Sequence, residues 1–180
     1  ASINDGLAGY WNFDETQGNI SYDSSGKGNN GTLVNGPRWV TGKVGGALEF
    51  DGINDYVGIA DSLSLHLSNN MSICAWFYPR KGSFILSKSD GFNREYGVHY
   101  SSYHYLQFAY NRSFVNSTPL ILSPNTWHHF CIVSDTNITF FIDNSLVVKT
   151  NVYILNKNYP LAIGRDGNVN NYFFNGTIDE

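Results

Sequence analysis

The chain has 180 residues and a formal net charge of −4, with 42% hydrophobic, 16% aromatic and 14% charged residues. This length suits one globular domain. The apolar content is too high for a disordered tail. The negative charge argues against binding to a nucleic-acid backbone. Because no run of about 18 apolar residues occurs, no membrane insertion is expected either.

Short runs rich in β-branched and aromatic residues recur along the chain, separated by clusters of Gly, Asn, Asp, Ser and Pro. This spacing is typical of a β-sandwich. The run at 71–79 has apolar residues on both faces, which predicts a central strand, and 61–67 predicts a short helical turn or a connector. The expected strands are 6–13, 31–34, 46–50, 55–59, 71–79, 84–88, 96–100, 105–110, 127–134, 138–143, 145–149, 160–164 and 172–179.

Asparagine is unusually frequent, with 22 residues, and seven of them stand in an N-x-S/T sequon, about twice the number expected from composition. We interpret this as a sign of a secreted, glycosylated protein; the alternative is that the Asn-rich composition alone accounts for the seven sequons. The sequon residues are Asn19, Asn30, Asn70, Asn111, Asn116, Asn137 and Asn175.

The chain has two cysteines, Cys74 and Cys131, each inside an expected strand. Their spacing fits neither a metal site nor a C-x-x-C redox motif. Two alternatives remain open from the residues alone: two separate core cysteines, or one buried disulfide that joins two strands.

Eight short motifs follow one another nearly from end to end: GLAGYWNFDE, DSSGKGNNGTL, GGALEFDGINDYVGI, MSICAWFYP, NTWHHFCIVSD, ITFFIDNS, LAIGRD and FFNGTIDE. In this order and spacing the chain resembles the laminin G-like branch of the concanavalin A-like jelly-roll domains. The resemblance implies an all-β jelly roll of two antiparallel sheets with little or no helix, in which the first and last strands pair. Family members continue beyond I-D-E, which implies that 1–180 is a single domain from a longer chain.

The cysteines look like the pair that pentraxins, relatives of the same fold, join as a disulfide, so the resemblance implies a bond between Cys74 and Cys131. The pentraxin signature is incomplete, because Asp135 stands where it has Trp. The acidic calcium cluster of pentraxins also has no counterpart after the expected hairpin at 138–149. The disulfide is therefore expected, and a phosphocholine site is not.

Domains of this fold often hold one structural calcium that ties the first strand and its loop to the last strand. The alternative is that Asp14 and Asp23 accept backbone N–H bonds in their turns and that Asp179 faces solvent. Asn30 cannot be a buried ligand and carry a glycan at once. The ligands implied by resemblance are Asp14, Asp23, Asn30, Gly31 and Asp179.

The same fold also hosts glucanases, whose site resembles E-x-D-x-x-E with two carboxyl groups about 5–5.5 Å apart. The nearest match is Glu49, Asp51 and Asn54, and the Asn54 amide cannot act as a general acid. The adjacent His128 and His129 face opposite sides of a strand and cannot converge on one ion. We therefore expect no enzyme.

Aromatic and polar residues gather between 96 and 114, where rings could stack on the C–H faces of a sugar. The structural alternative for each tyrosine is that it covers a sheet face. The candidate ligand-binding residues are Tyr96, Tyr103, Arg112, Arg165 and Tyr172.

Together these features favour a non-catalytic extracellular recognition module within a larger surface protein, which binds carbohydrate or mediates adhesion to a glycan or protein on a cell surface. The alternative is a structural or assembly domain of a glycosylated cell-surface layer, filament or virion, which contacts neighbouring copies of itself. The sequons and the missing last strand favour that alternative more than they favour a lectin. A glycoside hydrolase is the weakest hypothesis, because it lacks an acidic pair.

Overall fold

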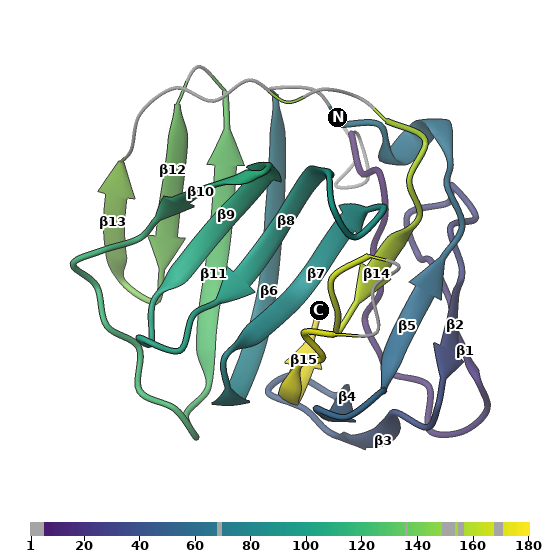
Figure 1. Ribbon diagram of the computed structural model, residues 1–180. Coiled ribbons are helices and arrows are strands. Elements are labelled where there is room, and N and C mark those ends of the chain that lie inside the picture. Colours follow the sequence, from purple (N-terminus) through teal and green to yellow (C-terminus); the bar gives the residue numbers. More distant parts are fainter. Residues whose placement is uncertain (1–5, 68–69, 136, 149–153, 155–156, 168–170) are drawn as a thin grey trace.

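The structure is a computed structural model that describes the chain except residues 1–5, 68–69, 136, 149–153, 155–156 and 168–170. The described residues form two antiparallel sheets packed as two layers, with one short 3-10 turn, Leu63–Leu65, in the connector where a helical turn is expected. Figure 1 shows one sheet in front of the other. The molecule is therefore the expected all-β jelly-roll sandwich. Among the described residues, no helix has the length and apolar character to cross a membrane.

The eight-stranded sheet, which we call sheet A, forms the front layer in Figure 1. Its strands, in order across the sheet, are β1 (Ile20–Ser21), β2 (Gly31–Val34), β5 (Tyr56–Ile59), β14 (Leu161–Ile163), β7 (Ser83–Ser89), β8 (Arg94–Tyr100), β9 (Leu106–Asn111) and β10 (Ser113–Asn116).

The seven-stranded sheet, sheet B, lies behind it, and β6 (Met71–Lys81) is its central strand, as the apolar character of both faces of this strand predicts. Its strands are β13 (Ser145–Val148), β12 (Ile138–Ile142), β11 (His128–Ser134), β6 (Met71–Lys81), β15 (Asn175–Asp179), β4 (Gly46–Asp51) and β3 (Arg38–Thr41).

The core lies between the inner faces of the two sheets and is rich in aromatic rings. Phe77 and Phe130 from sheet B lie 5.7 Å apart between ring centroids, and Phe77 also meets Tyr100 from sheet A at 5.8 Å. These side chains have no exposed surface. Because burial stabilises at about 25 cal/mol per Å² of apolar area, such rings contribute strongly to holding the layers together.

The expected pairing of the first and last strands is wrong. Residues 6–13 form no strand, and the first strand, β1, pairs with β2 at the edge of sheet A, whereas the last strand lies between β4 and β6. The backbone of Tyr10 bonds instead to a turn: its N–H donates to Asp23 Oδ1 and its carbonyl accepts from Ser24. These bonds take the place of a strand ladder.

The disulfide between Cys74 and Cys131 is confirmed. The two residues lie directly opposite each other on β6 and β11. The expectation that the bond is buried is wrong, because Cys74 is exposed on the outer face of sheet B. The alternation of the strand explains this, since the neighbouring Ala75 and Phe130 point into the core.

Candidate functional site

Five side chains form a continuous surface on the outer face of sheet A, which we call the aromatic surface. Ile85, Val98 and Val115 belong to the core, so the alternation of β7, β8 and β10 turns their neighbours Phe84, His99 and Phe114 outward. Irregularities in register within β7 and between β8 and β9 adjust which residues share this face. The surface consists of Phe84, Arg94, His99, Phe114 and Tyr172.

Phe84 is the centre of the aromatic surface. Its ring centroid lies 4.7 Å from that of His99, 6.3 Å from Phe114 and 6.5 Å from Tyr172. Phe84 is only 2% exposed, whereas Phe114 is 42% and Tyr172 is 60% exposed. The buried ring of Phe84 therefore forms a floor, and the two exposed rings beside it are accessible from outside the molecule.

Arg94 lies over this floor and is held by a buried carboxylate. Its guanidinium carbon is 4.8 Å from the Phe84 centroid and 5.5 Å from that of Phe114, within cation–π range. Its Nε donates to Asp166 Oδ1 at 3.1 Å, and its Nη2 donates to Asp166 Oδ2. Asp166, which has no exposed surface, also accepts from the hydroxyls of Ser87 at 3.0 Å and Ser89 at 3.1 Å.

A row of neutral polar groups continues the surface toward the sheet edge. His99 Nδ1 lies 2.7 Å from Gln107 Oε1, and Gln107 Nε2 donates to Asn116 Oδ1 at 2.7 Å. Burial lowers the pKa of His99, with the bond to Gln107 acting in the opposite direction, so the ring is neutral down to lower pH than usual.

The structure corrects two of the ligand residues expected from the sequence. Tyr96 is 2% exposed, and its hydroxyl donates to the Leu65 carbonyl at 3.1 Å. Arg165 is 9% exposed, with its guanidinium carbon 3.6 Å from the Tyr56 centroid. Neither side chain lies on an open surface that a stacked sugar requires, because both pack against other parts of the fold.

The other three expected ligand residues are exposed, but they lie in different places. Tyr172 belongs to the aromatic surface. Tyr103 is 73% exposed and stacks on Tyr105 in the loop before β9, with centroids 6.3 Å apart. Arg112 is exposed in the turn that joins β9 and β10. Sequence reasoning therefore found one member of the aromatic surface and missed the other four.

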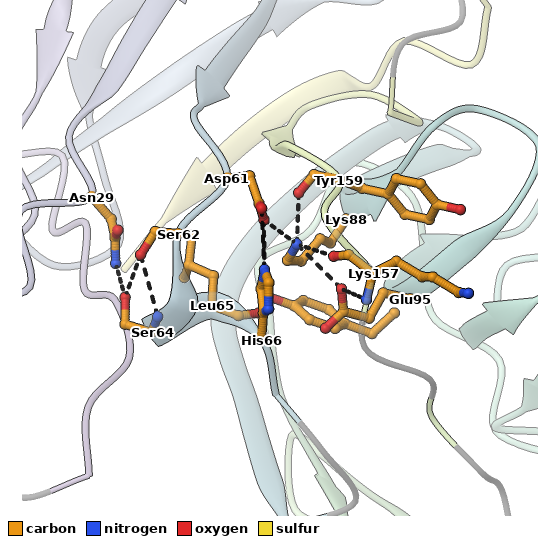
Figure 2. A network of polar contacts seen from close by, with 11 residues as sticks. Asn29, Asp61, Ser62, Ser64, Leu65, His66, Lys88, Glu95, Lys157 and Tyr159 are labelled. Atoms are coloured by element: carbon orange, nitrogen blue, oxygen red, sulfur yellow. Dashed lines mark hydrogen bonds and ion pairs between the residues drawn. The ribbon is translucent and has the colours of Figure 1, made fainter.

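A buried polar network lies at one end of the sandwich, on the inner side of β7 (Figure 2). The ammonium of Lys88, which has no exposed surface, lies 2.7 Å from Asp61 Oδ1 and 3.2 Å from Glu95 Oε2, and it donates to the carbonyls of Lys157 at 2.9 Å and Tyr159 at 2.6 Å. Burial raises the pKa of Glu95, although Lys88 and the Lys157 N–H oppose the shift. These oxygens surround the ammonium and leave it no place for a ligand.

Asp23, an expected calcium ligand, is occupied by backbone donors. Its Oδ1 accepts from the N–H groups of Tyr10 at 3.0 Å and Ser25 at 2.9 Å, and its Oδ2 accepts from Asn29 at 2.9 Å. Burial alone raises the pKa of Asp23, but these bonds outweigh it, and the pKa is lowered. Asn30 Oδ1 accepts from the Asp23 N–H at 2.9 Å, so it too has a donor.

Asp14 and Asp179 meet the same loop, before β4. Asp14 Oδ1 accepts from the Gly46 N–H at 2.8 Å, and Asp179 Oδ2 accepts from Lys43 at 2.7 Å and Val44 at 2.9 Å. The alternative that Asp179 faces solvent is wrong, because it is fully buried, and burial raises its pKa. Its Oδ1 has no hydrogen-bond partner among the described residues.

The expected calcium ligands are therefore brought together only in part. Gly31 lies in β2 between Ser21 and Ile59, away from the loop before β4 in the sheet order. In the described ranges no group of three or more His, Cys, Asp or Glu side chains could hold a metal ion. The arrangement does not fit a preformed cage around all five residues.

The carboxylates considered for catalysis also have structural partners. Glu49 accepts from Arg38 and Arg80, each at 2.6 Å. Asp51 Oδ1 accepts from the N–H groups of Ile53 at 2.7 Å and Asn54 at 3.3 Å, as an Asp in a turn does.

The sequon residues differ in exposure. Asn19, Asn30 and Asn70 are exposed, and the other four, Asn111, Asn116, Asn137 and Asn175, are half-buried. Asn175 Nδ2, the atom a glycan would modify, donates to the Asp51 carbonyl at 2.7 Å. Glycosylation at Asn175 would therefore replace one of the two hydrogens on an atom that already bonds β15 to the end of β4.

A cavity of about 740 Å³ lies elsewhere, where residues 6–11 pass the inner side of β6. Leu7, Trp11, Leu67 and Met71 contribute to its mainly apolar walls. Such walls offer less hydrogen bonding to sugar hydroxyls than the row beside His99. The aromatic surface is therefore the better candidate for a polar ligand.

Comparisons with known proteins agree with this architecture. A family model described as the concanavalin A-like lectin/glucanases superfamily matches residues 51–180, whereas no curated protein matches. Domain 4 of AbnA, an extracellular GH43 arabinanase from Geobacillus stearothermophilus solved with arabinotriose, is similar at a TM-score of 0.74 and 19% identity, covering 96% of this chain and 89% of that one.

Two other solved structures share the fold. The binding domain of Paraclostridial mosquitocidal protein 1 is similar at a TM-score of 0.75 and 14% identity, covering 99% of this chain and 48% of that one. Domains LG4-5 of the mouse laminin α1 chain are similar at a TM-score of 0.59 and 15% identity, covering 74% of this chain and 39% of that one. The family model, which covers most of the chain, shows that this protein belongs to the concanavalin A-like lectin/glucanases superfamily.

Proposed function

We propose that this domain is a non-catalytic carbohydrate-binding module and that its ligand binds on the aromatic surface. The observation that carries the proposal is the pair of exposed rings, Phe114 and Tyr172, beside the buried floor of Phe84. Flat rings bind the C–H face of a pyranose or furanose by apolar contact. The arrangement offers a ring-lined platform rather than a deep pocket, which suits an oligosaccharide.

A sugar site also requires hydrogen-bonding groups, and the row of polar side chains beside the rings supplies them. Sugar hydroxyls both donate and accept hydrogen bonds, and the side-chain amides of Gln107 and Asn116 can do the same. Both amides share the outer face with Phe114 and are fixed by their mutual bond. The similar domain 4 of the arabinanase was solved with a bound sugar, which supports the proposal by analogy of fold alone.

The proposed location is extracellular or on a cell surface, within a larger surface protein. The disulfide supports this, because such bonds persist in oxidising compartments. The three exposed sequons, Asn19, Asn30 and Asn70, are compatible with glycosylation there. Mass spectrometry of protein secreted from a eukaryotic host tests it, and unmodified asparagines at all seven sequons would count against glycosylation.

A matched pair of variants tests the binding function. Phe114→Ala removes an exposed ring from the aromatic surface, and Phe141→Ala removes one of similar exposure, 43%, from the outer face of sheet B. After a glycan array has identified a ligand, calorimetry should show affinity reduced about fivefold or more in Phe114→Ala, since an aromatic contact is worth roughly 1 kcal/mol or more. Phe141→Ala should bind like the wild type. Equal affinities in the two variants, or no ligand on the array, would contradict the proposal.

An assembly function remains the second candidate, and a different surface favours it. Cys131, Phe141 and Leu146 lie in one cross-strand row on the outer face of sheet B, where Leu146 is 59% exposed. Apolar rows of this kind occur at contacts between subunits. Analytical ultracentrifugation would support assembly if the wild type associates with rising concentration and Phe141→Ala does not; a monomer at all concentrations would argue against it.

We also propose a structural calcium near Asp14 and Asp179 as a separate, testable feature. The support is the buried Asp179 Oδ1, which lacks a hydrogen-bond partner among the described residues. Carboxylate oxygens are the ligands that calcium prefers. A melting temperature that rises with calcium and falls with a chelator would support the ion, and an unchanged melting curve would refute it.

A further inference from the structure

We infer that the aromatic surface selects neutral glycans and discriminates against glycans that carry a carboxylate or a sulfate. The inference rests on the proposed function and adds the class of ligand. It follows from the contacts of Arg94, the one cation among the five residues of the surface.

Arg94 already uses one edge of its guanidinium within the molecule. An arginine recognises a carboxylate through two N–H groups on one edge of its guanidinium. In this protein Nε and Nη2 already donate to Asp166. The guanidinium also packs against the rings of Phe84 and Phe114. The Nε edge is thus filled from within the molecule, and the N–H groups that remain belong to a cation whose charge is already paired with Asp166.

The partner carboxylate is itself fixed. Asp166 has no exposed surface and accepts from Arg94, Ser87 and Ser89. These bonds place it directly beneath the surface, where it forms an ion pair with Arg94. An anionic ligand placed over this pair meets no net attraction, and it loses its hydration without compensation.

The remaining groups of the surface carry no charge either. Burial lowers the pKa of His99, so its ring is neutral at pH 7, and its neighbours Gln107 and Asn116 are amides. Phe114 and Tyr172 provide apolar faces. The surface thus offers stacking and neutral hydrogen bonds, which fit an uncharged sugar.

The test uses pairs of glycans that have the same sugar units and differ in one charged group, such as a uronic-acid oligosaccharide and its methyl ester, measured by calorimetry at low and high salt. We expect the neutral member to bind at least about tenfold more tightly, with little dependence on salt. Equal or tighter binding of the acidic member would overturn the inference and leave the proposed function standing. Binding of no glycan at all would overturn both.

Two variants separate the role of the ion pair from that of folding. Asp166→Asn keeps the shape of the side chain but frees the charge of Arg94, so affinity for the acidic member should rise about tenfold. The double variant Arg94→Gln with Asp166→Asn removes both charges and should keep the neutral preference. Unfolding of either variant, checked by circular dichroism, leaves the wild-type comparison as the decisive measurement. A folded Asp166→Asn with wild-type selectivity would contradict the inferred role of the pair.

Discussion

The two faces of strand β7 carry two ionic clusters that are built differently. On the inner side, the ammonium of Lys88 is surrounded by oxygens from Asp61, Glu95 and two backbone carbonyls. On the outer side, the carboxylate of Asp166 is surrounded by donors from Ser87, Ser89 and Arg94. Adjacent residues of one strand thus serve a buried cation and a buried anion.

The difference lies in what each cluster touches. The inner cluster joins the connector at 61–66 to the segment at 157–159 through Lys88 (Figure 2). The outer cluster supports Arg94, which packs against the buried ring of Phe84 and the exposed ring of Phe114. The inner cluster therefore holds two segments of the fold together, whereas the outer cluster positions a side chain of the aromatic surface. Each can be broken separately.

The largest expected effect comes from the inner cluster. Lys88→Met keeps the length of the side chain and removes the charge, which leaves Asp61 and Glu95 close together without a cation. Breaking a buried pair costs about 3–5 kcal/mol in the free energy of unfolding. Urea denaturation measures it, with the exposed Lys81→Met as control. Equal unfolding midpoints for the two variants would show that the inner cluster does not fasten the fold.

A smaller effect is expected from the outer cluster. The double variant Ser87→Ala and Ser89→Ala removes two hydroxyl donors from Asp166 but leaves Arg94 in place. Loss of hydrogen bonds to a buried charged group costs roughly 1–3 kcal/mol. The same denaturation assay applies, with the exposed Ser102→Ala as control. If stability is unchanged, Arg94 alone suffices to hold the carboxylate.

The smallest effect concerns the turn between the clusters. Hydrogen bonds from the N–H groups of Asn93 and Phe92 lower the pKa of Asp90 from 3.8 to about 2. Because the folded pKa is the lower one, the carboxylate stabilises the fold above about pH 4, and this contribution is lost as the pH falls toward 2. The wild type should therefore be more stable than Asp90→Asn at pH 6, and the two should converge near pH 2. A constant difference across this range, measured by denaturation at each pH, would refute the assignment.

Local signals predicted most of the strands well. The hairpin of β12 and β13 follows from two alternating runs around Asp143, which adopts a φ of 52° in the turn. The hairpin of β9 and β10 was missed, because its turn depends on Asn111 at a φ of 49° and the second strand is short. Asparagine adopts this conformation more readily than most residues, so the Asn111–Arg112 pair was the feature of the sequence that could have indicated the turn.

The aromatic surface could not be read from periodicity, because it depends on breaks in the strands. Phe84 and Ser87 are three residues apart, yet both serve the outer face, since the register shifts between Phe84 and Leu86. A second shift, between Arg94 and Gly97, accompanies the burial of Tyr96. Simple alternation assigns such residues to the wrong faces. The pairing of Asp166 with Arg94 spans 72 residues of sequence, so no local pattern indicates it.

The disulfide has a consequence for survival in a protease-rich environment. Cys74 and Cys131 are 57 residues apart, and the segment between them contains all of β7, β8, β9 and β10. The exposed tips of this segment, at Phe92 and Tyr103, are where a protease would cut first. A single cut there would leave both fragments covalently joined through sheet B, and their strands would still be paired. A nicked molecule would thus keep β7, β8, β9 and β10 together, with the disulfide acting as a tether on the opposite side of the sandwich.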